Sequence, residues 1–272
     1  MNKVLLTVIG LGFALGMNAQ EAADKKFQMG LALGAGMNFT KPQTKLIDRK
    51  GLGGDFTIGM NLNWNFNKNV GLATGLEFDL ESFKYHMSGT SGLYYGYSDT
   101  EILRKKDDVP TDANLFLVTD RKQKPIYLSI PTMFLFRTDM IGYFRYFGKF
   151  GVRHSILLSQ SVDDKGFMFD DGTLAFIPAE NEKMKAAGDM PRYKGAVGLS
   201  GGAEWNFTGS TSLVAEIGYY YGFTNMHSQN ALTGDDDKNK TLFEMDPSVS
   251  GPVYRALSAK QGQLMLKVSI LF

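Results

Sequence analysis

The feature of this sequence that most constrains its fold is a two-residue alternation of large apolar side chains. In residues 55–66, DFTIGMNLNWNF, a large apolar residue stands at every second position, and Asp, Thr, Gly or Asn stands between. Such a period predicts a β-strand with two different faces. Because the second face is mostly Asn, Gly and Thr, we interpret it as the lining of an interior rather than a face turned to water.

Seven other segments repeat this alternation. They are residues 26–40, 70–80, 126–137, 146–159, 193–207, 213–223 and 263–272. The connections after the second, fourth and sixth strands are short, whereas those at residues 41–54, 86–125, 160–192 and 225–262 are long. Strands of about ten residues, with short turns at one end and long loops at the other, are typical of transmembrane β-barrels.

The predicted fold is all-β: an eight-stranded antiparallel up-and-down transmembrane β-barrel with short periplasmic turns and four long extracellular loops. A bilayer requires closure, because an open sheet edge would leave backbone amides unpaired in hydrocarbon. A soluble lipocalin-like barrel is the alternative, but it predicts Lys, Glu and Asp on the face where Gly, Ala, Ser and Asn dominate. Aromatic residues near strand ends fit interfacial girdles; these are Trp64, Tyr146, Tyr193, Trp205, Tyr219 and Tyr221.

The first twenty residues predict export. Lys3 precedes an apolar run at residues 4–15, which is typical of a signal peptide and too short to span a bilayer as a helix. We therefore divide the chain into a signal peptide, residues 1–20, and an outer-membrane β-barrel, residues 21–272. The 29 Lys and Arg residues nearly balance the 28 Asp and Glu residues, so we expect no nucleic-acid partner, and the lack of Cys excludes disulfides.

Charged residues recur on the inward parity of the predicted strands. The set is Glu77, Asp79, Glu81, Arg137, Lys149, Arg153, Lys194, Glu204, Glu216 and Lys267. Five acids and five bases can neutralise one another, and buried carboxylates are normally paired. The pattern predicts a closed lumen filled by ion pairs, without an ion-conducting pore. The alternative reading of the carboxylates at 77, 79 and 81 as a metal or proton site is less favoured, and no cofactor is expected.

The strand at residues 126–137 fits the alternation less well. Tyr127, Pro131, Met133 and Leu135 place apolar bulk on the face predicted to point inward, and proline removes a backbone donor. Two explanations remain open: a bulge near Pro131, or apolar contacts in the lumen between charged layers.

The chain offers few residues for catalysis. His154 and Ser155 are adjacent in a strand and face opposite sides. His86 and Ser88 share a face, and a lipid A deacylase with eight strands uses a His-x-Ser arrangement on its wall. A triad also needs an orienting acid, and the sequence shows none at the matching place.

Acidic pairs and runs in the long connections are candidate calcium ligands. Residues 235–237 are three consecutive Asp residues, but they lack the ligand spacing and the terminal Glu of a calcium loop. We interpret them as a solvated loop, and we interpret residues 163–164 and 170–171 in the same way.

Basic clusters and the last residue suggest contacts with the envelope. Residues 104–106, Arg-Lys-Lys, and 121–124, Arg-Lys-Gln-Lys, bracket one long connection, where cations can meet phosphates of lipopolysaccharide. Phe272 ends an alternating strand on an aromatic residue, which resembles the signal that the outer-membrane assembly machinery reads.

Two stretches resemble a known family. IYLSIPTMFLFRTDMIGYFRYFGKFGVRHSILLS and GLSGGAEWNFTGSTSLVAEIGYYYGF are similar to PorT-like outer-membrane β-barrel proteins of Gram-negative bacteria that carry the type IX secretion system. The resemblance covers most of the predicted barrel and little of the long loops. It implies an outer-membrane location and a role near secretion, and it supplies no catalytic motif.

Together these observations favour a non-enzymatic barrel that is integral to the outer membrane and serves as a structural or accessory component of a complex, in type IX secretion or membrane assembly. Its expected partners are outer-membrane lipid, lipopolysaccharide, the assembly machinery and other complex subunits. A barrel enzyme acting on lipid A is the first alternative, and a small-solute pore is the second.

Overall fold

The computed structural model describes residues 25–89, 92–105, 107, 113–208, 211–228, 240–245, 248 and 251–272. The predicted signal peptide, residues 1–20, lies outside them. All regular elements of the described residues are β-strands, as predicted. No helix in this part of the chain is long and apolar enough to cross a membrane.

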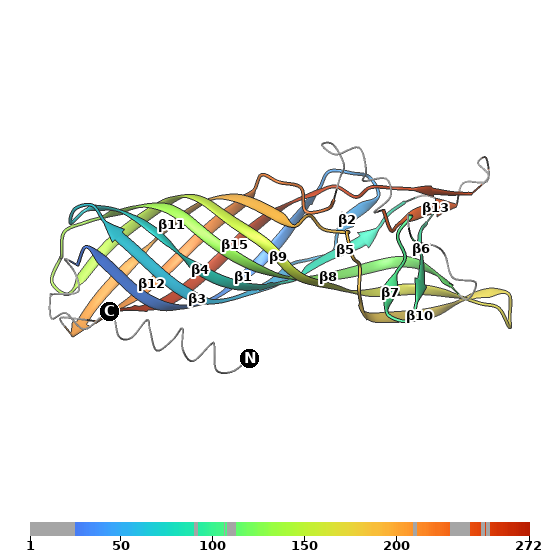
Figure 1. Ribbon diagram of the computed structural model, residues 1–272, viewed down its shortest axis with the longest axis horizontal. Helices are drawn as coiled ribbons and strands as arrows, with labels where there is room; N and C mark the ends of the chain where they lie inside the picture. The colour runs from blue at the N-terminus through green and yellow to red at the C-terminus, as the bar shows by residue number, and fades with distance from the viewer. Residues whose placement is uncertain are drawn as a thin grey trace.

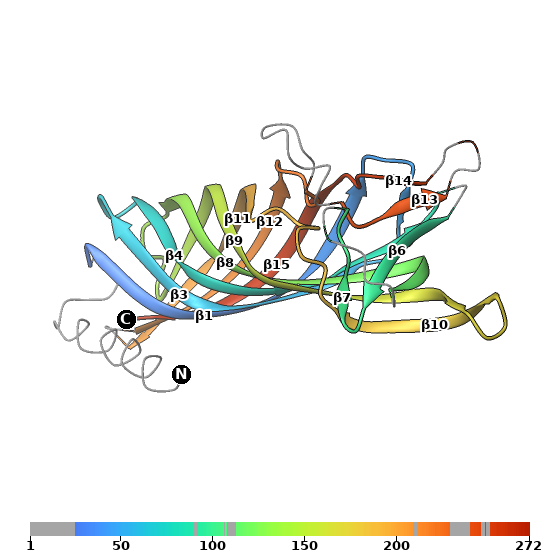
Figure 2. The same ribbon diagram turned by 45° about the vertical axis from the view of Figure 1, so that its right-hand side comes forward.

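Eight strands pair edge to edge in a closed ring (Figures 1 and 2). In ring order they are β1 (Phe27–Pro42), β3 (Gly53–Asn65), β4 (Val70–Glu81), β8 (Asn114–Arg137), β9 (Phe144–Asp170), β11 (Tyr193–Thr208), β12 (Thr211–Gly222) and β15 (Ala259–Leu271). Every neighbouring pair is antiparallel, and β1 pairs with β15 to close the ring. These are the eight segments that the alternation predicts.

The outside of the ring is an apolar belt. Directly opposed residues on adjacent strands share a face of the sheet, and Leu33 of β1 stands opposite Ile58 of β3 and Val268 of β15. Ile58 in turn stands opposite Phe78 of β4. All four are exposed on the outer face, as the predicted parity requires.

Short connections join strands at one end of the ring, which we call the turn end. Asn67 closes the β3–β4 turn, because its Oδ1 accepts hydrogen bonds from the amides of Asn69 and Val70 at 2.9 and 2.8 Å. Gly142 adopts a positive φ of 65° between β8 and β9, a conformation that suits glycine. The C-terminus lies at this end (Figure 1).

At the opposite end the strands extend far beyond the predicted bounds. β8 contains 24 residues and β9 contains 27, and shorter strands pair with their extensions: β2 (Ile47–Arg49), β5 (Phe83–Met87), β6 (Leu93–Ser98), β7 (Glu101–Ile102), β10 (Ala175–Met184), β13 (Phe243–Met245) and β14 (Pro252–Tyr254). The prediction that residues 86–125 and 160–192 are long loops is therefore wrong for most of their described residues.

The predicted alternation ends at these bounds although the strands continue. Beyond them the apolar residues lie on the inward face and the polar residues lie on the outward face. In β4 the apolar residues Phe78 and Leu80 point outward, whereas in the continuing β5 Phe83 and Tyr85 occupy the inward parity and are buried. In β8 the outward face changes from Ile126 to Lys124 and Lys122, and a register shift between Val118 and Asp120, further along the strand, then exchanges the two parities.

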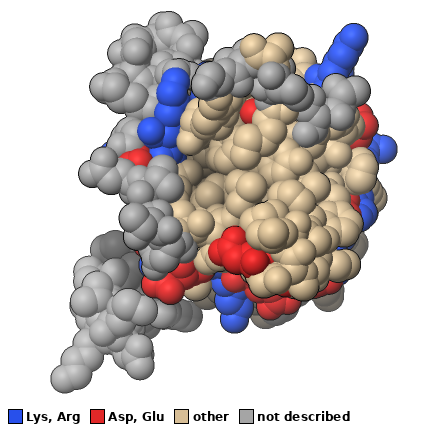
Figure 3. Space-filling view, turned by 90° about the vertical axis from the view of Figure 1, so that its right-hand side faces the viewer, with Lys and Arg blue, Asp and Glu red and all other residues tan. Residues whose placement is uncertain are grey.

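Buried apolar residues of the extensions, of the shorter strands and of the segments between them form an apolar core that we call the cap. Its members are Ile47, Phe83, Tyr85, Met87, Leu93, Tyr95, Tyr97, Ile102, Phe116, Val118, Tyr127, Val162, Met184, Ala186, Met190, Met226, Leu242, Leu257 and Ala259. Figure 3 shows this end of the molecule, where uncharged side chains dominate the middle and most charged ones lie toward the rim. The cap thus lies over the end of the ring opposite the turns.

Candidate functional site

The middle of the lumen is occupied by ion pairs around Arg153 of β9. Nη2 of Arg153 lies 2.6 Å from Glu77 Oε2 and 2.6 Å from Asp79 Oδ1. Lys267 of β15 lies 2.6 Å from the other oxygen of Glu77, and the hydroxyl of Thr57 donates to Asp79 at 2.6 Å. Two buried cations face two buried carboxylates, so the cluster is neutral.

Two further ion pairs cross the lumen between strands that are not neighbours in the ring. Lys194 of β11 lies 2.6 Å from Glu81 of β4 and 4.0 Å from the centre of the Tyr127 ring. Lys149 of β9 lies 2.6 Å from Glu216 of β12. The structure therefore brings eight of the ten predicted lumen residues into ion pairs.

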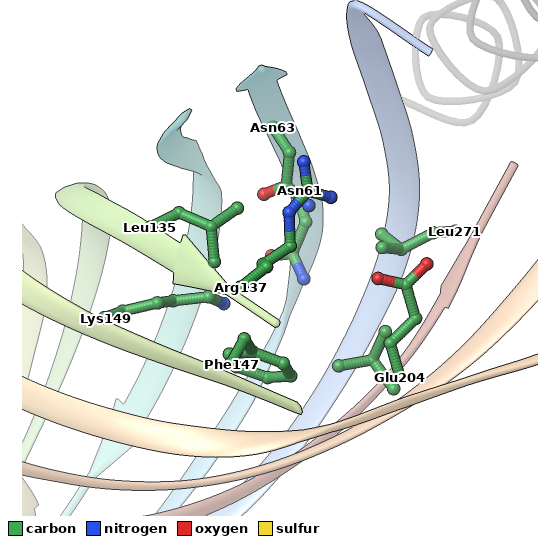
Figure 4. A pocket seen from close by; sticks show the side chains of 9 residues that line it. Asn61, Asn63, Leu135, Arg137, Phe147, Lys149, Glu204 and Leu271 are labelled. Atoms are coloured by element: carbon green, nitrogen blue, oxygen red, sulfur yellow. The ribbon is translucent and has the colours of Figure 1, made fainter. Parts of the chain in front are cut away.

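The other two predicted lumen residues, Arg137 and Glu204, line a small cavity near the turn end (Figure 4). Nη1 of Arg137 donates to Gln28 Oε1 at 3.0 Å. The cavity measures about 20 Å³, enough for about one water molecule. A second cavity of about 20 Å³ lies beside Glu77 and Lys149, so free space is small around the central ion pairs. A wider pocket of about 420 Å³ opens at the turn end beside Asn65 and Arg137.

Two buried charges in the lumen were missed. Asp55 of β3 accepts a hydrogen bond from Gln263 at 2.5 Å, and Arg145 stands opposite Glu204 in the register of β9 and β11; both are buried. The inward parity shared with Thr57 was a signal for Asp55. Arg145 lies one residue before the predicted strand at 146–159, in a segment predicted as a turn.

The irregular strand at residues 126–137 makes apolar contacts inside the lumen. Met133 and Leu135 pack in a cluster with Ala73, Ala196, Tyr220 and Met265. The apolar-contact explanation is therefore correct. A register irregularity does occur in this strand, but between Ile126 and Tyr127 rather than at Pro131.

The cap contains a buried polar network centred on Arg121 of β8. Arg121 pairs with both oxygens of Asp164 at 2.8 and 2.9 Å and with Asp189 at 3.0 Å. Burial alone would lower the pKa of Arg121, but the two carboxylates hold this pKa above its usual value. Its side chain is fully buried, so the prediction that Arg121 faces lipopolysaccharide is wrong, because β8 continues as a strand and turns this position inward.

The neighbouring basic residues have other surroundings. Lys122 and Lys124 occupy the outward parity of β8, and Lys124 pairs with Asp163. Arg104 pairs with Asp107 at 2.9 Å, and Lys105 lies 5.8 Å from the centre of the Tyr254 ring. Residue 106 lies outside the described part of the chain.

An acid does stand beside His86, contrary to the sequence-based expectation. Nδ1 of His86 lies 2.9 Å from Asp120 Oδ1, and Lys50 lies 2.7 Å from the other oxygen of Asp120. Partial burial would raise the pKa of Asp120, but hydrogen bonds from Lys50 and His86 outweigh it and keep this pKa below its usual value. The hydroxyl of Ser88 donates instead to the carbonyl of Lys45 at 3.1 Å.

His154 and Ser155 face opposite sides, as predicted. His154 is exposed on the outside and lies 2.8 Å from the hydroxyl of Tyr193, whereas Ser155 is buried in the lumen against Ser129. This geometry separates the two residues, so they form no catalytic pair.

The acidic pairs divide between the cap and the surface. Asp164 is buried against Arg121, so its interpretation as a solvated loop residue is wrong. Asp170 lies at the tip of the β9–β10 hairpin and accepts a hydrogen bond from Thr173 at 2.6 Å. Residues 235–237 lie outside the described residues. The described part of the chain contains no cluster of three His, Asp or Glu residues that could hold a metal.

Phe272 lies beside β1 at the turn end. Its amide donates to the carbonyl of Met29 at 2.8 Å, and its carbonyl accepts from the Met29 amide at 3.3 Å. Of the predicted girdle residues, five are exposed on the outside of the ring and Tyr221 is half-buried; the five are Trp64, Tyr146, Tyr193, Trp205 and Tyr219.

A family match agrees with this architecture. A family model described as the outer membrane protein beta-barrel domain matches residues 18–228, and no curated protein matches the chain. Among solved structures, the chain is similar to the attachment invasion locus protein Ail of Yersinia pestis, with 12% identity, a TM-score of 0.33 and coverage of 91% of this chain and 100% of the other.

It is also similar to OprG of Pseudomonas aeruginosa, with 11% identity, a TM-score of 0.36 and coverage of 93% and 96%. A third similar structure is the outer membrane protease OmpT of Escherichia coli, with 10% identity, a TM-score of 0.33 and coverage of 94% and 99%. These scores are too low to transfer an activity.

Proposed function

Because the chain belongs to the outer membrane protein β-barrel domain family and is integral to the outer membrane, we propose that it is a non-enzymatic barrel with a sealed lumen. In this proposal the eight strands of the ring cross the bilayer, the short turns face the periplasm and the cap faces the outside. The barrel serves as a structural or accessory component of an outer-membrane complex.

The observation that carries this proposal is the packing of the interior. Ion pairs bridge the lumen from β4 to β11 and from β9 to β12, and the cavities beside them have room for about one water molecule each. The apolar cap lies over one end. A ring of eight strands is just wide enough for side chains to fill it.

The test is single-channel recording of the purified protein in planar bilayers. We expect no conductance steps, because ion pairs fill the middle of the lumen and each cavity beside them holds about one water molecule. A known porin reconstituted in the same bilayer is the positive control. Stable steps of porin size would contradict the sealed lumen and favour the small-solute pore.

The accessory role rests on the PorT-like resemblance and on the surface that the cap presents. It predicts that the tagged protein, extracted from native membranes in mild detergent, brings stoichiometric subunits of a secretion or assembly complex with it. Recovery of the barrel alone under conditions that preserve a known complex would favour a purely structural role.

The contact between His86 and Asp120 keeps a lipid-modifying enzyme as the second candidate. Ser88 is hydrogen-bonded to a carbonyl and Asp120 is shared with Lys50, which disfavours it. The test compares lipid A masses from cells carrying the wild type and the H86A and S88A variants. A mass difference that both variants abolish would establish the enzyme; identical masses in all three strains would exclude it.

Phe272 is proposed to act as the assembly signal, because it directly follows the last strand of the ring at the turn end and hydrogen-bonds to Met29 of β1. We expect removal of Phe272 to reduce the amount of folded protein in the outer membrane while the amount synthesised stays the same. The matched control is F272Y, which keeps an aromatic ring and should assemble normally.

A further inference from the structure

A charged groove lies on the outer face of the strands, just beyond the apolar belt. It has a volume of about 300 Å³, and every residue that lines it is charged. The lining comes from the end of β2, from β5, from the extensions of β8 and β9, and from β10. This groove is separate from the lumen.

Most charges of the groove are neutralised within the protein. Lys50 pairs with Asp120 at 2.7 Å, Lys165 pairs with Glu180 at 2.6 Å, and Lys124 pairs with Asp163. Arg121 and Asp164 pair inside the cap. Among the described residues, the lining charges that make no ion pair are Lys84, Lys122 and Glu182.

Lys84 and Lys122 are direct register partners on β5 and β8. On its other side Lys122 stands opposite Asp163 of β9, whose carboxylate pairs with Lys124. Side chains in such positions start about 5 Å apart, and like charges there destabilise a sheet. An anionic group between the two ammonium groups removes this repulsion and accepts charge-assisted hydrogen bonds from both. Glu182, on β10 at the other side of the groove, offers a carboxylate to a cation.

The height of the groove matches that of lipid headgroups. The last outward apolar residues below it are Leu80 and Ile126, and Lys84 and Lys122 lie four positions further along their strands. At about 3.3 Å per residue and a strand tilt of about 40°, this is roughly 10 Å beyond the hydrocarbon edge. Lysine side chains are long enough to reach back toward the interface.

We propose that this groove binds the phosphoethanolamine headgroup of an outer-membrane lipid. Lys84 and Lys122 hold the phosphate, and Glu182 holds the ammonium group. The zwitterion matches the two cations and the one carboxylate of the lining that make no ion pair. The proposal goes beyond the sealed barrel and is independent of it, since a conducting lumen would leave this outer surface unchanged.

The test uses the full protein in nanodiscs that contain equal amounts of phosphatidylethanolamine and phosphatidylglycerol with identical acyl chains, followed by native mass spectrometry of the retained lipids. We expect the wild type to retain phosphatidylethanolamine about five-fold over phosphatidylglycerol, a ratio equivalent to about 1 kcal/mol. E182Q should bring the ratio close to one, whereas K84Q/K122Q should reduce retention of both lipids.

The matched controls are E101Q and K185Q, which remove the same charges from an exposed pair outside the groove. Both should keep the wild-type ratio, and a folded-state check by gel mobility before and after heating applies to every variant. A wild-type ratio of one, or an unchanged ratio in E182Q together with unchanged retention in K84Q/K122Q, would overturn the proposal.

A second arm identifies the source of the headgroup. The protein is extracted from native outer membranes, and the retained lipid is identified by mass. A glycerophospholipid with phosphoethanolamine, or lipid A that carries this group, would each support the proposal and name the source. Retention only of lipids that lack an amine would refute it.

Discussion

The lumen and the cap are two interiors formed by the same strands, and they are filled with opposite chemistry. The lumen holds ion pairs such as Arg153 with Glu77 and Asp79, whereas the cap holds aromatic and aliphatic side chains such as Tyr95 and Phe116. Their outer faces are inverted in the same way: the ring presents an apolar belt, and the extensions present Lys, Asp and Glu.

The difference teaches that the surrounding medium, not the direction of a side chain, decides what a strand places inside. In lipid the outward face must be apolar, so the remaining parity is left for polar residues. In water the outward face is polar, and apolar residues gain about 25 cal/mol per Å² by moving inward. The inversion between Leu80 and Phe83 therefore marks the level where lipid gives way to water.

The comparison predicts its largest effect where a lumen charge loses its partner. R153M leaves Glu77 and Asp79 short of a cation in a buried site, and breaking such a cluster costs about 3–5 kcal/mol. We expect this loss in the free energy of unfolding from lipid vesicles, measured by urea titration. The control is K165Q, at an exposed pair, which should leave the unfolding midpoint unchanged. Equal effects of the two substitutions would mean that buried and exposed ion pairs contribute equally to stability.

In the cap, truncation of a packed aromatic residue should cost a similar amount but act locally. F116A removes a fully buried ring that stacks on Tyr95 with 5.3 Å between ring centres, and such changes cost about 3–5 kcal/mol. Hydrogen exchange should rise in β6 and in the extensions of β8 and β9, while the amides within the ring stay protected. Uniform loss of protection would show that ring and cap unfold as one unit.

Acid should weaken the cap through His227, which is buried beside Tyr85 with 5.4 Å between ring centres. Burial lowers its pKa to about 4, and the Asp189 carboxylate only partly offsets this effect. The folded state then binds fewer protons than the unfolded state between about pH 6.5 and 4, so stability is full above pH 6.5 and falls as the pH drops to 4. The loss amounts to about 3 kcal/mol, since each unit of difference between the unfolded and folded pKa of His227 corresponds to ~1.4 kcal/mol.

Hydrogen exchange of the cap across this pH range measures the effect of His227, because H227F removes the titrating group and nearly preserves the volume. The wild type should lose protection toward pH 4 more steeply than H227F. Parallel profiles would mean that carboxylates alone cause the acid sensitivity of the cap.

A charge placed in the apolar belt tests the other side of the comparison. Ile58 is an outward residue near the middle of β3, and an Arg at such a position costs about 2–4 kcal/mol when it lies at the bilayer midplane. We expect I58R to lower the free energy of unfolding from vesicles by this amount and I58L to leave it nearly unchanged. An I58R protein as stable as the wild type would place β3 outside the bilayer.

Alternation along the chain was sufficient to determine that the protein is all-β, which eight segments form the ring, which parity faces outward, and that both signs of charge point into the lumen. These properties are local, because a period of two assigns each side chain to a face. The same rule failed at Phe83, where the strand continues but the medium outside it changes, and at Val118, where a register shift exchanges the two faces of β8. Neither event can be seen from the alternation of a single segment.

Only the tertiary structure decided which charges meet. Lys194 joins Glu81 across 113 positions, and Asp120 reaches His86 across 34. Arg121 lies inside the cap and Lys122 outside it, although both belong to one basic run. Such contacts depend on how far each strand is offset from its neighbours when the ring closes, and this offset is a property of all eight strands together.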